Sequence, residues 1–209
     1  MLDASGTLTV RAADGESGTL PSGTWPWADA IDQITSLVFE PGVKAGSSLN
    51  DLFNDAANLT SADLSGLDAS GATAIDRMFK DCSSLIDVNL RGFDSSNATS
   101  MAELFSGCSS LEKADLSSID NLSVADPYSG LSGMFEGCTK LSSITLGQRF
   151  SHGGGQENSH TTIFPNLPAY QGFTNLWRSS WNNRLYTRSN TGKGYEGIPD
   201  RIAATYTAE

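Results

Sequence analysis

The stretch that decides the fold is LTSADLSGLDASGATAIDRMF at residues 59–79, which continues as KDCSSLIDVNLRGFDSSNATSMAELF at 80–105 and SGCSSLEKADLSSID at 106–120. These lines repeat with a period of 26 residues, so that Phe53, Phe79 and Phe105 align. A fourth copy follows after an insertion of four residues, and an earlier, diverged copy begins at Ile34. The chain is therefore a tandem array of about five repeats.

Each repeat contains two apolar spacings. The first half has the pattern L-x-x-L-x-L, as in Leu85, Val88 and Leu90, and its last two positions have the spacing of a β-strand. Further along, apolar residues stand at i, i+3, i+4 and i+7, which predicts one face of a short helix. The segments with this helical spacing are 49–56, 75–82, 101–108 and 131–138.

Turn residues follow the predicted helices. Gly107 and Gly137 stand where a left-handed residue would close a helix, and Asp55 and Asp81 fill the same place in the earlier copies. The unit is therefore predicted to be strand, turn, short helix, turn. One such unit cannot bury its own apolar face, so neighbouring units must stack into a solenoid.

The repeats share distinctive sequence motifs: D-x-S precedes the predicted helix, M-F lies within it, and G-C-S-S-L follows it. GCSSL at 107–111 and DCSSL at 81–85 resemble the BspA-like leucine-rich repeats of bacterial surface proteins, and the likeness covers roughly residues 34–146. The chain departs from that pattern at 71–73, where Gly-Ala-Thr replaces Asn-Val-Thr, and in the insertion near 126–129.

The resemblance and the repeat pattern together predict an α/β solenoid. We expect a right-handed, leucine-rich-repeat-like array with one parallel β-sheet face, short helices on the other face, and a cap at each end. The expected divisions are an N-terminal cap at 1–33, a solenoid of about five repeats at 34–147, and an irregular C-terminal cap at 148–209. We expect Trp25 and Trp27 to belong to the first cap, and the aromatic residues after 164 to bury the last repeat.

Charge limits the classes of partner. The net charge is −11, and the acidic residues are concentrated in residues 1–147, where 7 Lys and Arg face 20 Asp and Glu. Such a surface disfavours nucleic acid and anionic membranes, because neither gains from contact with it. No apolar stretch approaches the length of a membrane span. We expect a monomeric fragment of a larger exported protein.

The chemistry-bearing residues give no enzyme signature. Cys82, Cys108 and Cys138 all fall on the inward face of the predicted helices, so we expect three buried, reduced thiols without a metal or redox role. The two histidines share the Gly-rich segment 151–160 without other ligands, which is a weak metal signal. No phosphate-binding loop, zinc motif, calcium loop or nucleophile elbow is present, so we expect no cofactor.

Strand alternation identifies the residues that leave the core. On the expected sheet face, Val38, Asp63, Asn89, Asp115 and Thr145 stack above one another. The candidate binding residues on this outward face are Asp63, Asn89, Arg91, Lys113, Asp115 and Thr145. Asp63 and Asp115 would have backbones about 10 Å apart, which is close to the carboxylate spacing of an inverting glycosidase. An open, solvated face lacks the burial that would tune either carboxylate as an acid.

Three functions remain open at this stage. The first is a non-enzymatic extracellular binding or adhesion module at a bacterial cell surface or cell wall, recognising a host matrix protein, a mucin, a glycan or another cell. The second is a rigid spacer that displays other domains and has no ligand of its own. The third, a polysaccharide-active enzyme, depends on the carboxylate spacing and the aromatic tail.

Overall fold

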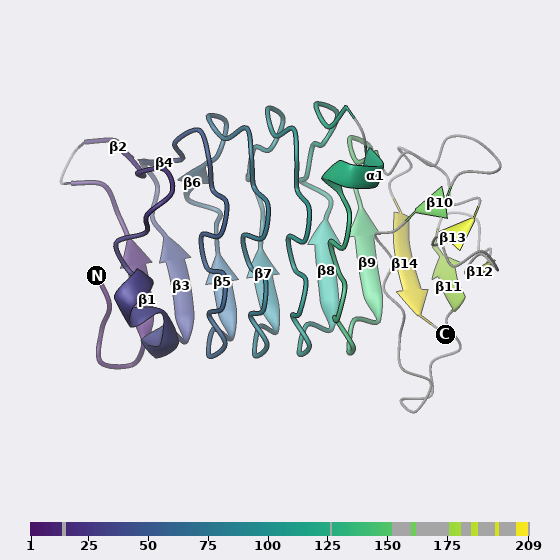
Figure 1. The fold of residues 1–209 in the computed structure, drawn as a ribbon, viewed down its shortest axis with the longest axis horizontal. Helices are drawn as coiled ribbons and strands as arrows, with labels where there is room; N and C mark the ends of the chain where they lie inside the picture. Colours follow the sequence, from purple (N-terminus) through teal and green to yellow (C-terminus); the bar gives the residue numbers. More distant parts are fainter. Residues whose placement is uncertain are drawn as a thin grey trace.

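The computed structural model describes residues 1–13, 16–125, 127–151, 160–161, 176–180, 185–187, 195–196 and 204–208. The chain winds into a parallel β-solenoid of about five coils with little helix, and the coils follow one another along the long axis (Figure 1). The repeat and the solenoid are therefore as the sequence predicts. The secondary structure on the other sides of the solenoid differs from the prediction.

One side of the solenoid carries the predicted parallel strands, which form the strand face. These strands are β1 (Thr7–Val10), β3 (Ser36–Phe39), β5 (Ser61–Asp63), β7 (Asp87–Asn89), β8 (Lys113–Leu116) and β9 (Ser143–Leu146). Strands β1, β3, β5 and β7 form one sheet in that order, and β8 pairs with β9 in another. Alternation in each strand directs one set of side chains into the core, including Leu37, Ala62 and Ile144.

A second side also carries a parallel sheet, which the prediction of a single sheet missed. It consists of the short strands β2 (Gly18–Thr19), β4 (Val43–Lys44) and β6 (Leu67–Asp68). Val43 and Leu67 are buried, and Phe93 and Ile119 are buried at the same position of the next two repeats. This column recurs every 26 residues from Leu67 to Ile119. This repeated apolar position is therefore the feature of the sequence that indicates the second side of the solenoid.

The third side is made of turns where short helices were predicted. Residues 49–56, 75–82, 101–108 and 131–138 form successive turns, and bridges join Ser48 to Ala74 and Ala74 to Ser100 in parallel. We call this side the turn edge. The helix prediction is wrong here, although the inward positions of its apolar residues are correct.

Hydrogen bonding between coils explains the turns. The N–H groups of alternate residues donate to the next coil, as from Asp51 to Asp76 at 3.1 Å and from Phe53 to Met78 at 2.8 Å. The residues between them close short turns within the coil, so the i−4 bonds of an α-helix are absent. Left-handed residues make this path possible.

Two columns of left-handed residues repeat along the turn edge. The predicted column has positive φ throughout, at Asp55, Asp81, Gly107 and Gly137. A second column, four residues earlier in each coil, contains Asp51, Arg77, Glu103 and Gly133. The two columns repeat a sharp turn in every coil, and apolar residues at i, i+3, i+4 and i+7 then point inward without a helix.

Stacked aromatic rings run through the core beside the turn edge. Trp27, Phe53, Phe79, Phe105 and Phe135 form a continuous column with ring centroids 5.2–6.0 Å apart. Trp27 stands one period before Phe53, so it occupies the same position in the first coil. The indole N–H of Trp27 donates to the carbonyl of Leu52 at 3.0 Å.

The three cysteines form a parallel column and are free and fully buried, as predicted. Each Sγ donates to a phenylalanine carbonyl of the preceding coil, at 3.1 Å from Cys82 to Phe53 and at 3.0 Å from Cys138 to Phe105. Burial raises the pKa of the Cys138 thiol to about 12. The neighbouring Cys82 thiol, together with burial, raises the pKa of Cys108 well above its ordinary value. The thiols of Cys108 and Cys138 are therefore protonated packing groups at neutral pH.

The ends of the chain extend the strand face. Strand β1 pairs with β3, and the 3-10 helix η1 (Ala28–Gln33) leads into β3. At the other end β14 (Ala204–Ala208) pairs antiparallel with β9 and buries Tyr206. The remaining elements are α1 (Pro127–Gly130), β10 (His160–Thr161), β11 (Leu176–Ser179), β12 (Leu185–Thr187) and β13 (Tyr195–Glu196). The division into two caps and a solenoid stays a prediction, because most of 148–209 lies outside the described residues.

Candidate binding site

The predicted outward column lies on the strand face in two separate runs. Val38, Asp63 and Asn89 are paired in register across β3, β5 and β7. Asp115 and Thr145 are paired across β8 and β9. The strand face is divided where these runs meet, because β7 and β8 belong to different sheets and are not hydrogen-bonded to each other.

A groove of about 320 Å³ lies at this division. Its lining residues are Asp87, Val88, Asn89, Leu90, Arg91, Asp115, Ser117 and Ser118. Val88 is only partly buried there, whereas Ala62 and Ile144, which point inward at the same position on paired strands, are buried. We call this feature the β7–β8 groove.

The same two coils are firmly joined on the turn edge. The N–H groups of Met101, Glu103, Phe105 and Gly107 donate to carbonyls of the next coil at 2.7–2.9 Å. The coils that carry β7 and β8 are therefore joined on the turn edge, although their strands are not paired on the strand face. The groove is a local opening of the strand face in an otherwise continuous solenoid.

Several of the predicted binding residues have a structural role that the sequence reasoning missed. Asp63, Asn89 and Asp115 each accept a hydrogen bond from the backbone N–H two residues later, at 2.9–3.1 Å. These Asx turns end strands β5, β7 and β8. The signal is a repeated Asx-Leu-x at 63–65, 89–91 and 115–117. An Asx turn does not occupy both side-chain acceptors, but it fixes the orientation of the side chain.

Asp63 is further held by its neighbour in the sheet. Its Oδ1 accepts a hydrogen bond from Nδ2 of Asn89 at 2.9 Å. Burial acts to raise the pKa of Asp63, but the hydrogen bonds from Ser65 and Asn89 outweigh it, and the pKa lies below its ordinary value. A general acid needs the opposite shift. The geometry therefore gives Asp63 the properties of a turn residue with a stable negative charge.

The groove brings together three of the six predicted residues: Asn89, Arg91 and Asp115. Asp63 lies on β5, and neither it nor Lys113 lines the groove. Thr145 lines a second hollow of about 530 Å³ at the C-terminal end of the strand face, where its hydroxyl is 3.0 Å from that of Thr205. The second hollow is lined by Ser117, Thr145, Leu146, Gly147, Gln148, Arg149, Ser180 and Thr205.

Sequence reasoning did not select Asp87, Ser117 and Ser118 as site residues. Alternation places Asp87 and Ser117 on the outward face, so their direction was available from the sequence. Their importance depends on the opening between β7 and β8, which no local pattern indicates. Asp87 and Arg91 are exposed, and neither side chain has a hydrogen-bond or ion-pair partner within the described residues.

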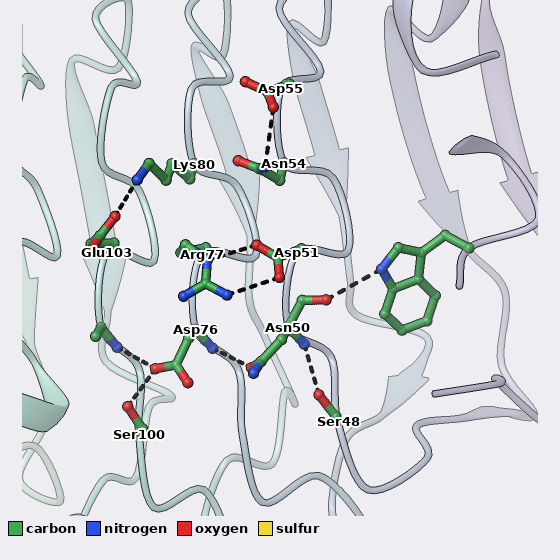
Figure 2. A network of polar contacts seen from close by, with 12 residues as sticks. Ser48, Asn50, Asp51, Asn54, Asp55, Asp76, Arg77, Lys80, Ser100 and Glu103 are labelled. Atoms are coloured by element: carbon green, nitrogen blue, oxygen red, sulfur yellow. Dashed lines mark hydrogen bonds and ion pairs between the residues drawn. The ribbon is translucent and has the colours of Figure 1, made fainter. Parts of the chain in front are cut away.

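The turn edge carries the other large group of charged residues (Figure 2). The guanidinium of Arg77 binds both oxygens of Asp51, at 2.7 and 3.0 Å, and Lys80 pairs with Glu103. The hydrogen bonds and charge of Asp51 raise the pKa of Arg77. These charges are satisfied by each other across neighbouring coils.

Hydrogen bonds from backbone N–H groups to side chains extend the network along the turn edge. Asn50 accepts from the N–H of Asp76, and Asp76 accepts from the N–H of Ala102, both at 2.8 Å (Figure 2). The same position in successive coils thus carries an acceptor for the coil that follows. The turn edge is held together by its polar groups, whereas the β7–β8 groove has polar groups without such partners.

The described residues hold no cluster of three or more metal-ligating side chains. Within the same part of the chain, no helix has the length and apolar character needed to cross a membrane. One histidine lies outside the described residues, so the histidine segment is not tested as a metal site.

Comparison with known proteins gives one family. No curated protein matches the chain, and no solved structure matches it. The family described as "Mycoplasma protein of unknown function, DUF285" matches residues 47–151, which is half of the chain and covers the coils with the clearest repeats, β7, β8 and the groove between them. The chain therefore belongs to the DUF285 family.

Proposed function

We propose that the protein is a non-enzymatic binding or adhesion module that recognises its partner through the outward strand face. The observation that carries this proposal is the β7–β8 groove, where the exposed side chains of Asp87 and Arg91, which have no partner among the described residues, lie beside two strands that are not paired with each other. A solenoid presents this surface on a rigid frame, so little conformational entropy is lost when a partner binds.

The place of action that fits this function is the bacterial cell surface or cell wall, with the chain as part of a larger exported protein. The resemblance of the repeats to BspA-like leucine-rich repeats supports this placement, as does a polar surface rich in Ser, Thr, Asn and Gly. The partners would be a host matrix protein, a mucin, a glycan or another cell. The negative charge of the solenoid favours basic segments of such partners and speeds their association at low salt.

The test compares two matched charge reversals in the full chain. One variant combines Asp87→Lys with Arg91→Glu on the strand face, and the control combines Glu136→Lys with Lys140→Glu beside the turn edge. All four side chains are exposed, and each pair of changes leaves the net charge unaltered. Binding to arrayed matrix proteins, mucins and glycans is then measured for wild type and both variants.

We expect the strand-face variant to lose binding by about tenfold or more and the control to retain it, since two charged contacts at a binding surface contribute of the order of 1 kcal/mol each. The opposite result would place recognition on the turn edge. A wild type that binds no member of the arrays would favour a spacer that only displays other domains, because a rigid solenoid needs no ligand for that role.

A further inference from the structure

We propose that a neutral oligosaccharide chain binds on the strand face, along a polar groove that extends from β7 to β14. This inference rests on the proposed function, because it assumes that the strand face is the binding surface, and it adds the chemical class of the ligand. The sugar chain would lie on the surface, across the ends of the strands, and would not enter between them.

The β7–β8 groove and the second hollow adjoin each other. Ser117 lines both, and the strands that border them, β7, β8, β9 and β14, follow one another along the solenoid (Figure 1). Strand β9 pairs with β8 on one side and with β14 on the other, so β8 and β14 are about 10 Å apart, and β7 lies beyond β8. We call the combined feature the strand-end groove. Its elongated form suits a chain-shaped ligand.

A glycine keeps the groove open where its two parts meet. Gly147 follows β9 and occupies the position that Ser117 has in the preceding coil. A side chain at this position would collide with the backbone of Ser117, because its Cβ atom would meet the carbonyl oxygen of that residue. The next coil therefore has no side chain beside Ser117, and the exposed hydroxyl of Ser117 is accessible to a ligand.

The exposed side chains of the strand-end groove offer both donors and acceptors. Asp115 uses Oδ1 in its Asx turn, and its Oδ2 has no hydrogen-bond partner among the described residues. Within the same part of the chain, the side chains of Ser117, Ser118 and Gln148 also have no partner. Each hydroxyl of a sugar donates and accepts hydrogen bonds, so a lining of carboxylate, hydroxyl and amide groups is complementary to it.

The charges of the lining favour a neutral ligand. Asp87 and Asp115 are acidic, whereas Arg91 and Arg149 are basic, so the formal charges of the lining side chains cancel. Arg149 also binds Asp120. The chain as a whole is different, with 24 acidic residues against 13 basic ones. A strongly charged ligand would be attracted by one set of lining groups and repelled by the other, whereas a neutral sugar would not.

The lining also indicates how tightly such a ligand would bind. The only lining residues without a polar side chain are Val88, Leu90, Leu146 and Gly147, and none of the lining residues is aromatic. Recognition would therefore depend on hydrogen bonds without ring stacking, so the affinity of one site should be modest. Binding would become stronger where many copies of the protein meet one polysaccharide.

The experiment measures binding of the full chain to an array of neutral linear oligosaccharides of increasing length, with sialylated and sulfated chains beside them. Binding should strengthen as sugar units are added and become constant once the strand-end groove is filled. It should also change little between about 0.05 and 0.5 M NaCl, because salt screens only interactions between charges. A steep loss of binding with salt would contradict the inference.

A matched pair of variants locates the site. Ser117→Ala and Ser65→Ala each remove one exposed hydroxyl from a residue whose backbone N–H donates to an Asx turn. Ser65 occupies the same position two coils earlier and lies outside the strand-end groove. We expect Ser117→Ala to weaken binding of the tightest neutral oligosaccharide by about two- to tenfold, which corresponds to one hydrogen bond, and Ser65→Ala to leave it unchanged.

Two results would overturn the inference while leaving the proposed function in place. One is that no neutral oligosaccharide binds, although a matrix protein or an acidic glycan binds in a way that the strand-face charge reversal abolishes. The other is that a neutral oligosaccharide binds, but Ser117→Ala has no effect or both serine variants weaken binding equally. If no arrayed ligand binds, the inference and the proposed function fall together.

Discussion

The strand face contains a closed junction and an open one that follow each other directly. Between β5 and β7 the strands pair in register and Asn89 donates to Asp63, whereas β7 and β8 are unpaired and the half-buried Val88 borders a groove. Both junctions join repeats of 26 residues with the same L-x-L spacing. The repeat therefore fixes the path of the coil, but it does not by itself fix the pairing of every strand.

The turn edge explains how an open junction is tolerated. The coils of β7 and β8 remain joined there by backbone hydrogen bonds, by the stacking of Phe105 on Phe135 at 5.5 Å, and by the hydrogen bond from Cys138 to Phe105. Three kinds of contact thus hold one side of the junction. The strand face can open locally because it is not the only connection between the coils.

The largest expected effect comes from opening a junction at the end of the array. Deleting residues 164–209 removes β14, which pairs with β9 and buries Tyr206 against the core. The β9 edge would then be open without a neighbouring coil to limit access, so we expect aggregation. Size-exclusion chromatography and thermal melting check this, and a soluble monomer with an unchanged Tm would contradict it.

Core substitutions on a strand paired on both sides and on β7, which is unpaired on one side, should lower the free energy of unfolding by different amounts. This difference is smaller than the effect of the deletion but measurable. Ile144 is fully buried between paired strands, and Ile144→Ala should lower the free energy of unfolding by about 2–5 kcal/mol. Val88 points inward at the same position but is only partly buried at the groove. Val88→Ala should therefore cost about 1 kcal/mol.

Urea denaturation of both variants measures this difference. Val88→Ala removes two carbon atoms and Ile144→Ala removes three, so the comparison is made per carbon removed. An equal cost per carbon would mean that the junction between β7 and β8 is as tightly packed as a paired one. That result would remove the groove as a feature of the protein in solution.

Substitutions in the cysteine column test whether the coils of β7 and β8, which are unpaired on the strand face, stay joined on the turn edge. The Sγ of Cys108 donates to the carbonyl of Phe79 and joins the coils of β5 and β7, whose strands are paired. The Sγ of Cys138 donates to the carbonyl of Phe105 and joins the coils of β7 and β8, whose strands are not paired. Replacing either with Ser should cost about 1–3 kcal/mol, because a smaller, more polar group would replace a buried sulfur.

We expect Cys108→Ser and Cys138→Ser to have similar costs. A much smaller cost at Cys138 would show that the two coils are loosened along both sides. In the wild type, a thiol reagent should titrate three groups in denaturant and few in the native protein, since all three thiols are buried and free. Rapid labelling of the native protein would contradict the packing described for the column.

The sequence predicts the inward-pointing residues better than the backbone that carries them. The repeat, with its insertion of four residues before the last copy, correctly places the phenylalanine column, the three thiols and the left-handed Asp55, Asp81, Gly107 and Gly137. It suggests helices because spacing at i, i+3 and i+4 also arises from successive turns. Only the hydrogen bonds to the neighbouring coil distinguish the two, and these depend on stacking that a single repeat does not encode.

The candidate site was predictable only in part for a related reason. Alternation gives the outward direction of Asn89, Arg91 and Asp115, and all three line the groove. Which outward residues gather around an opening depends on the pairing of β7 with β8, a long-range property. The Asx turns of Asp63, Asn89 and Asp115 could have been found, since the Asx-Leu-x spacing is visible in the sequence.

The smallest expected effect is a change in the acidity of Asp63 when its neighbour across the closed junction is removed. Burial acts to raise the pKa of Asp63, but hydrogen bonds from Ser65 and Asn89 hold it below the ordinary value. Asn89→Ala removes one of these donors, so the pKa of Asp63 should rise toward its ordinary value. A lowered folded-state pKa contributes stability that is present above the unfolded pKa of about 3.9 and is lost as pH falls through the folded pKa.

Asn89→Ala should therefore reduce the stability that Asp63 contributes at every pH above about 4, and this difference from the wild type should disappear as the pH falls through the folded-state pKa. NMR titration of the Asp63 carboxyl carbon measures the shift directly. Asp94 is the control, because its pKa is lowered by the hydrogen bonds from Ser96 and does not depend on Asn89. If the pKa of Asp63 stays where it is in the wild type while Asp94 is unchanged, Asn89 does not bond to Asp63 in solution, and the junction between β5 and β7 would be closed by its backbone alone.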